Sequence, residues 1–230
     1  VTPKNVKQII LQFLRNPDNF AKLRELQMDD LKKLTLISSV NSLKTVHQVW
    51  VANKDNSREA FWQDFFKDNS WVISYVFSFP VVLFKDKAYV GGKTLDNKGG
   101  EIIDFIYKHH FTENVLLVEI KTPTVKLLGS EYRNGIFSMS QDLSGAVSQI
   151  LDYKNEILNS YADLIRKAGK TFAVFNPRCM IVAGNIMNEL NSDNKRKSFE
   201  LHRNDSRQID IVGFDELFQK VEYLVQILEK

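Results

Sequence analysis

Asn114-Val-Leu-Leu-Val-Glu119-Ile-Lys121-Thr-Pro123 is the stretch that decides the fold of this 230-residue chain. Its apolar residues form a nearly unbroken run of strand length that is rich in branched side chains. Such a run places apolar side chains on both faces, which predicts a central strand covered on both sides. Pro123 ends the strand, because proline offers no N–H to a hydrogen-bond ladder.

An acid and a base lie where this strand ends. Successive side chains of a strand alternate, so Glu119 and Lys121 point to one face and Ile120 to the other. A carboxylate and an ammonium at a buried strand end are costly without partners, and a cation and a phosphate would supply them. A simple salt bridge between the two side chains is the alternative, because the same spacing recurs in helical and polar contexts such as Asp152 and Lys154.

Composition sets broad bounds on the chain. Its length suits one large domain, and 16 Phe residues can supply a sizeable core. The net charge of +3 permits nucleic-acid binding without arguing for it, because the basic residues are spread along the chain. The single cysteine, Cys179, cannot form a disulfide within the chain and suits a reducing cytoplasm. No apolar run approaches the roughly 20 residues of a membrane span, so we expect no membrane contact.

The N-terminal part of the sequence has helical periodicity. We expect residues 1–50 to be helical, with a break at Pro17, and to pack on the main domain or on another subunit. Residues 51–55 are the expected boundary, so that 51–230 form the main domain. Asn56 with Glu59 three residues on resembles a capping box, which predicts a helix that begins at Asn56.

The rest of the sequence predicts an α/β fold with a mixed central sheet flanked by helices. The first three strands should form an antiparallel meander, and the polar segment 124–142 is long enough to be a functional or mobile loop. The longest helix is expected over 144–167 and a closing helix over 215–228, with a polar, basic stretch over 185–207. The predicted strands are 81–90, 101–107, 114–121, 171–175, 178–183 and 208–212.

A second carboxylate lies within the second predicted strand. Asp104 stands in an apolar run between Ile103 and Phe105, an unusual place for an acid. Adjacent antiparallel strands could bring it to Glu119, and two such carboxylates repel unless one is protonated or a cation lies between them. Oxygen ligands suit Mg²⁺ or Mn²⁺, with the Ile120 carbonyl as a further ligand. Lys121 could then orient or deprotonate the attacking water, or hold the phosphate.

Other polar residues allow two interpretations each. Gln149 and Tyr153 lie four apart on a predicted helix and share a face. The Gln amide could hold a water or a phosphate oxygen beside the metal, or be a surface side chain beside a packing Tyr. His109 and His110 could be metal ligands, but a plain turn is favoured. The basic residues that could contact phosphate, or simply form a solvated face, are Lys195, Arg196, Lys197, Arg203 and Arg207.

The ordered set Asp104, Glu119-Ile-Lys121 and Gln149-x-x-x-Tyr153 resembles the PD-(D/E)XK nuclease superfamily, the last element being similar to its RecB-like branch. More closely, the chain resembles the Shedu family of bacterial anti-phage nucleases over roughly residues 51–230. The stretches that carry this likeness are Phe61-Trp62-Gln63-x-Phe65-Phe66, Asn69-Ser-Trp71, Val118-Glu-Ile-Lys-Thr-Pro123, Ser144-Gly-Ala-Val-Ser-Gln149 and Ile209-Asp-Ile-Val-Gly-Phe-Asp215-Glu-Leu217.

This resemblance implies a restriction-endonuclease-like core and a Mg²⁺- or Mn²⁺-dependent DNA endonuclease that acts on phage DNA in the bacterial cytoplasm, as a homo-oligomer. It implies that Asp104 and Glu119 are metal ligands, Lys121 is the catalytic lysine and Gln149 is a supporting polar residue. Glu59 could match the first-helix acid that some superfamily members use, or serve only as a helix cap. Ile103 departs from the Pro of the superfamily name, at a variable position. The alternatives are a non-catalytic module of the same fold that binds nucleic acid or assembles a complex, and a phosphoesterase that acts on RNA or nucleotides.

Overall fold

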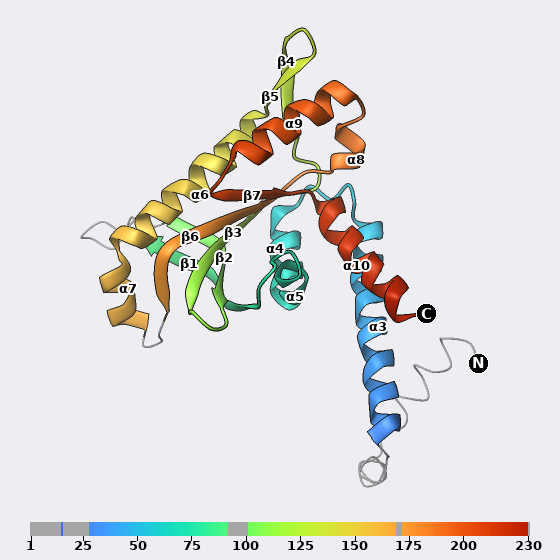
Figure 1. Ribbon diagram of the computed structural model, residues 1–230. Coiled ribbons are helices and arrows are strands. Elements are labelled where there is room, and N and C mark those ends of the chain that lie inside the picture. Colours follow the sequence, from blue (N-terminus) through green and yellow to red (C-terminus); the bar gives the residue numbers. More distant parts are fainter. Residues whose placement is uncertain (1–14, 16–27, 92–100, 169–171, 230) are drawn as a thin grey trace.

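A five-stranded mixed sheet forms the centre of the molecule (Figure 1). The computed structural model describes residues 15, 28–91, 101–168 and 172–229. The strand order is β1-β2-β3-β6-β7, in which β1, β2 and β3 form an antiparallel meander and β6 and β7 follow in parallel to β3. This confirms the α/β fold and the mixed sheet. The strands are β1 (Val81–Gly91), β2 (Glu101–His109), β3 (Asn114–Ile120), β6 (Ala173–Val182) and β7 (Ile209–Val212).

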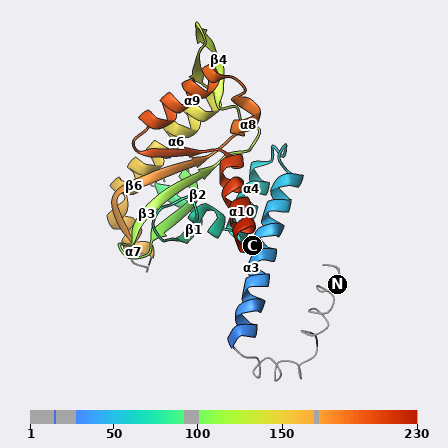
Figure 2. The same ribbon diagram turned by 45° about the vertical axis from the view of Figure 1, so that its right-hand side comes forward.

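Helices cover both faces of this sheet (Figures 1 and 2). The helix α6 lies over one face, and α4, α5 and α10 lie over the other, in agreement with the two hydrophobic clusters of the core. The described helices are α3 (Met28–Ala52), α4 (Glu59–Asp68), α5 (Trp71–Ser74), α6 (Gln141–Asn159), α7 (Tyr161–Ala168), α8 (Ile186–Glu189), α9 (Asp193–Asp205) and α10 (Phe214–Leu228). No helix in these ranges is long and apolar enough to cross a membrane.

The strand β3 is buried on both faces, as its sequence predicts. Val115 and Leu117 belong to the cluster beneath α6. Leu116, Val118 and Ile120 belong to the second cluster, whose aromatic residues come largely from α4 and α10. At roughly 1.5–3 kcal/mol for each large apolar side chain, this two-sided burial makes β3 a major contributor to the hydrophobic stabilisation of the fold.

The helix α3 joins the second cluster through its C-terminal half. Leu43, Val46 and Trp50 are buried there, and the Trp50 ring stacks on Phe218 of α10 with centroids 4.9 Å apart. The N-terminal half extends away from the sheet (Figure 2). All the apolar residues before Met28 that were predicted to be helical lie outside the described residues. The division into 1–50 and 51–230 stays a prediction.

The prediction of a loop over 124–142 was wrong, and a functional role for this segment stays a prediction. The segment contains a hairpin of β4 (Leu128–Arg133) and β5 (Ile136–Met139), which forms its own two-stranded sheet. At its tip, Asn134 and Gly135 have φ values of 49° and 77°. Asn-Gly is a strong hairpin signal because both residues tolerate positive φ. The polar composition of the segment concealed this turn.

Three other predicted elements have different bounds. The helix α6 begins at Gln141, because the Ser140 hydroxyl accepts a hydrogen bond from the Leu143 amide, and it ends at Asn159, where α7 takes over at Tyr161. The predicted break at Asn176-Pro177 is a bulge within the single strand β6, with Asn176 at a φ of 45°. The buried Lys154 ammonium donates to Asn176 Oδ1 across 2.7 Å and stabilises the bulge. The stretch 185–207 is largely helical and forms α8 and α9.

The base of the β4–β5 hairpin is fixed by hydrogen bonds from distant parts of the chain. The Glu189 carboxylate accepts from the Leu127 amide at 2.7 Å and from the Leu128 amide at 2.8 Å. The Ser140 hydroxyl donates to the Lys126 carbonyl, and the Ser198 hydroxyl accepts from the Phe137 amide. Because these bonds hold both strands, the hairpin is attached rigidly to α8, α9 and the start of α6.

Glu189→Gln should lower the free energy of unfolding by about 1–3 kcal/mol, because the amide has one oxygen to offer to two N–H groups. Urea denaturation measures this loss, with Asp152→Asn on the exposed surface of α6 as the control for a carboxylate-to-amide change. Equal midpoints for Glu189→Gln and the parent protein would contradict the anchoring role of Glu189.

Candidate active site

The β3 strand presents Glu119 and Lys121 to α6. Glu119 continues the row formed by Val115 and Leu117, which is the side of the sheet that α6 covers. The Glu119 side chain is only 4% exposed, and its Oε1 accepts from Lys121 Nζ across 2.8 Å. Its second oxygen, Oε2, is buried without a hydrogen-bond partner among the described residues. The shared face predicted for the acid and the base is confirmed.

Asp104 reaches the same strand from β2. The antiparallel register pairs Phe105 with Val118, and Asp104 Oδ2 accepts from the Ile120 amide across 2.8 Å. Burial and the charge of Glu119 raise the pKa of Asp104 to about 7. Burial likewise raises the pKa of Glu119, although Lys121 opposes the shift. The structure therefore brings the two carboxylates together, as the meander predicted.

Lys121 lies at the centre of a polar network. Its ammonium donates to Glu119 and, across 3.3 Å, to Gln149 Oε1 on α6, and it lies 3.8 Å from Glu59 Oε2. Gln149 Nε2 donates to the Tyr153 hydroxyl across 2.6 Å, so these two residues share a face as expected. Burial alone would lower the pKa of Lys121, but the charge and hydrogen bond of Glu119, with the charge of Glu59, raise it. The amine is therefore a cation at neutral pH.

The helix α4 contributes Glu59 to the site, but in a different way from the sequence prediction. The helix α4 begins at Glu59 with Arg58 as its N-cap residue, so the capping box from Asn56 was wrong. Asn56 Oδ1 instead accepts from the Arg58 amide, which leaves the Glu59 carboxylate free of a capping role. Glu59 accepts from Gln63 Nε2 at 3.2 Å and approaches Lys121, so it lies at the edge of the site.

Gln63 is the residue that sequence reasoning did not assign to the site. Its Nε2 donates to Asp104 Oδ1 across 2.6 Å, so one amide links Asp104 to Glu59. The spacing of four residues from Glu59 on α4 was the available signal, since it places both side chains on one helix face. The contact with Asp104 depends on how α4 packs on the sheet, which local sequence does not reveal.

The donor set suits a hard divalent cation. Asp104 and Glu119 supply carboxylate oxygens, and the partnerless Glu119 Oε2 is the kind of buried acceptor that a cation satisfies. No cluster of three His, Cys, Asp or Glu side chains with metal-binding geometry occurs in the described parts of the chain. Mg²⁺ is compatible with such a sparse set, because it keeps several waters and is often held by one or two carboxylates. The Ile120 carbonyl stays a predicted further ligand.

The remaining candidates occupy other places. His109 Nδ1 accepts from the Phe111 and Thr112 amides, which supports the turn interpretation. On α9, Arg196 pairs with Asp193, and Arg203 donates to Glu216 and lies over the Phe199 ring. Lys195 lies near the Glu189 carbonyl and the Phe137 ring, and Lys197 is exposed. Contact of these four basic residues with nucleic acid stays a prediction.

Comparison with known proteins agrees with this arrangement. The family model described as "Shedu protein SduA, C-terminal" matches residues 56–218, which include α4, the whole sheet, α6 and every residue of the polar network. The chain is also 40% identical over 222 residues to the Shedu protein SduA of Bacillus cereus (strain B4264). That match covers 93% of this chain and 58% of the relative, so the chain spans little more than half of the relative's length. On both findings, the chain belongs to the Shedu family.

Proposed function

We propose that the chain is a metal-dependent DNA endonuclease of bacterial anti-phage defence that hydrolyses or nicks phosphodiester bonds. The observation that carries this proposal is the meeting of two buried carboxylates, Asp104 and Glu119, with the Lys121 ammonium and the Gln149 amide. A purely structural salt bridge between Lys121 and Glu119 would not need the second buried acid, Asp104, because its negative charge repels that of Glu119. A cation and a phosphate complete the electrostatics of this cluster.

Asp104 and Glu119 are the residues that would hold Mg²⁺, with Mn²⁺ as a substitute. When bound, such an ion stabilises the charge on the phosphoryl oxygens and provides a more acidic water. Gln63 fixes the Asp104 carboxylate through its hydrogen bond, and the Ile120 amide fixes the second oxygen. The two carboxylate oxygens are therefore oriented before any ligand arrives.

Lys121 and Gln149 would handle the substrate. The cationic Lys121 can hold a non-bridging oxygen of the scissile phosphate, and its raised pKa keeps it protonated at neutral pH, so it would act as a cation and not as the base that deprotonates water. Gln149 positions the ammonium through its oxygen, and Tyr153 fixes the amide of Gln149. The substrate in this proposal is DNA, phage DNA in the cell, and the working form is a homo-oligomer.

The proposal is tested by incubating the chain with linear and circular DNA in Mg²⁺, Mn²⁺ or EDTA, and with RNA as a rival substrate. We expect metal-dependent DNA cleavage that Glu119→Gln reduces by at least about a hundredfold, because the amide removes a charge at the proposed metal site. Glu222→Gln on the surface of α10 is the matched control. Absence of cleavage together with absence of Mg²⁺ binding in calorimetry would favour the non-catalytic alternative.

A further inference from the structure

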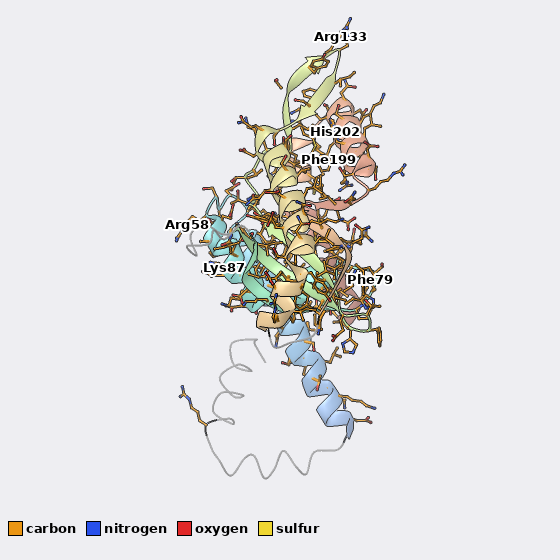
Figure 3. The ribbon with its side chains drawn as sticks, turned by 90° about the vertical axis from the view of Figure 1, so that its left-hand side faces the viewer. Arg58, Phe79, Lys87, Arg133, Phe199 and His202 are labelled. Carbon is orange, nitrogen blue, oxygen red and sulfur yellow. The ribbon has the colours of Figure 1, made fainter. Side chains whose placement is uncertain are left out.

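The β4–β5 hairpin stands clear of the two core layers. Figures 1 and 2 show it projecting from one end of the molecule, and Figure 3 shows Arg133 at its outer end. Tyr132 is 81% exposed and Ile136 is 57% exposed. Neither side chain is part of the hydrophobic core, so both are accessible to another molecule.

This hairpin is a rigid element. Glu189 and Ser198 anchor its two strands, and Phe137 and Met139 pack against the cluster beneath α6. At the tip, the backbone of Gly135 closely approaches the Asn194 side chain of α9. Little backbone conformational entropy therefore remains to be lost when the exposed residues bind a partner.

The hairpin also connects the two elements that supply the candidate site. The chain leaves β3 after Lys121, forms the hairpin and then enters α6, which carries Gln149. The distance along α6 from its first residue, Gln141, to Gln149 is about 12 Å at 1.5 Å per residue. The six residues of β4 span about 20 Å at roughly 3.3 Å per residue. The tip thus lies within about 32 Å of Gln149, which is less than one turn of a B-form duplex, about 34–36 Å.

Cations lie between the site and the hairpin. Lys54, Lys126 and Lys195 line a cavity of about 420 Å³ together with Pro123 and Thr124, which follow closely after Lys121. The acids Asp55 and Glu189 also line it, but Glu189 is committed to backbone amides. Within the ranges that the structure describes, Lys126, Lys195 and Arg133 form no ion pair, and Lys195 donates only a long hydrogen bond to the Glu189 carbonyl. Their charges are available to phosphates.

We infer that the β4–β5 hairpin is a DNA-docking arm that enters the major groove within one turn of the bond to be cut. Tyr132 and Arg133 contact the groove, and Lys126 and Lys195 hold the phosphates between the arm and Lys121. A two-stranded ribbon fits the major groove, which is about 12 Å wide. This inference rests on the proposed nuclease function and assigns its substrate as duplex DNA.

The test measures binding without cleavage. Fluorescence anisotropy with labelled duplexes is recorded for Glu119→Gln alone and for the same protein with Tyr132→Ala and Arg133→Ala. We expect the arm substitutions to weaken duplex binding about tenfold and to reduce the slope of log affinity against log salt by about 1. Tyr223→Ala on α10 and Arg166→Ala on α7, both at exposed positions, are the matched controls and should bind like the parent.

Duplex length provides a second arm of the test. A stem-loop duplex of about 6 base pairs, roughly 20 Å long, is too short to reach from the site to the tip of the arm, whereas a duplex of about 20 base pairs reaches both. We expect the parent to prefer the longer duplex by about tenfold and the arm variant to show about twofold preference at most, which a general folding defect would not produce. A photocrosslinking residue at position 132 should attach to duplex DNA.

The outcomes separate this inference from the proposed function. DNA cleavage by the wild type with equal duplex binding by parent and arm variant would overturn the docking arm and leave the nuclease in place. Arm-dependent duplex binding by a protein that never cuts would support the arm and count against the nuclease. If the arm substitutions change the oligomeric state in light scattering and leave DNA affinity unchanged, the hairpin is a protein contact and the inference is wrong.

Discussion

Lys121→Met should reduce the rate of DNA cleavage by about a hundredfold to a thousandfold and leave duplex affinity within about twofold. The Lys121 ammonium contacts Glu119 and Gln149 directly, and its raised pKa keeps it charged at neutral pH. Methionine retains an unbranched apolar stem of similar length and removes only the cation. The negative charge on the phosphate oxygens is greatest in the transition state, where the Lys121 cation would stabilise it most. Removing that cation should therefore slow the chemical step and leave binding nearly unchanged.

Single-turnover kinetics at saturating protein separates that chemical step from binding. Lys67→Met is the control, because Lys67 pairs with Asp86 on the surface. Lys121→Met also leaves Glu119 without its counterion, so thermal unfolding should accompany the kinetics and confirm that the variant is folded. Cleavage by Lys121→Met at the wild-type rate would remove Lys121 from the catalytic machinery and leave the salt bridge with Glu119 as its role.

The sequence predicted the centre of the fold and of the site because those features depend on local pattern. The two-sided burial of β3 follows from its apolar run, and strand alternation places Glu119 beside Lys121. The approach of Asp104 to β3 required only that two consecutive strands form a hairpin. Predicting that Gln149 lies beside Lys121 also required knowing how α6 packs on the sheet. That packing was inferred from the resemblance to known nucleases.

The missed features depend on contacts between distant residues. Gln63 and Asp104 are 41 residues apart, and only the packing of α4 makes their hydrogen bond possible. Glu189 binds amides of the β4–β5 hairpin from 61 and 62 positions away, so the polar composition of that hairpin concealed how firmly it is held. The expected capping role of Glu59 failed because the helix begins two residues later than predicted, at Arg58 and Glu59.

These long-range contacts explain the electrostatic state of the site. Gln63 and the Ile120 amide hold Asp104 in place near Glu119, although burial and charge repulsion disfavour two ionised acids there. Lys121 compensates one of the two negative charges. The folded protein therefore maintains a carboxylate pair that is unfavourable by itself, and binding of a divalent cation should relieve the repulsion.

This imbalance predicts how the metal-free protein responds to pH. The pKa of Asp104 is raised from 3.8 to about 7, so the folded state binds a proton that the unfolded state has released. The resulting stabilisation is complete below the unfolded pKa and is lost as the pH rises through about 7. In EDTA, we expect the wild type to lose on the order of 2–4 kcal/mol of stability between pH 4 and pH 8 from this group.

Asp104→Asn should remove that loss, because the amide is neutral like the protonated acid and can still accept from the Ile120 amide. Between about pH 4 and pH 7 the stability of the wild type should fall relative to that of the variant, so that the difference between them shifts in favour of the variant by pH 8. Adding Mg²⁺ at pH 8 should raise the melting temperature of the wild type and not that of Asp104→Asn. Calorimetric melting between pH 4 and 8.5 measures both effects, with Asp152→Asn as the exposed control. Parallel stability curves for Asp104→Asn and the wild type, unchanged by Mg²⁺, would show that Asp104 and Glu119 are not the repelling pair that a metal site requires.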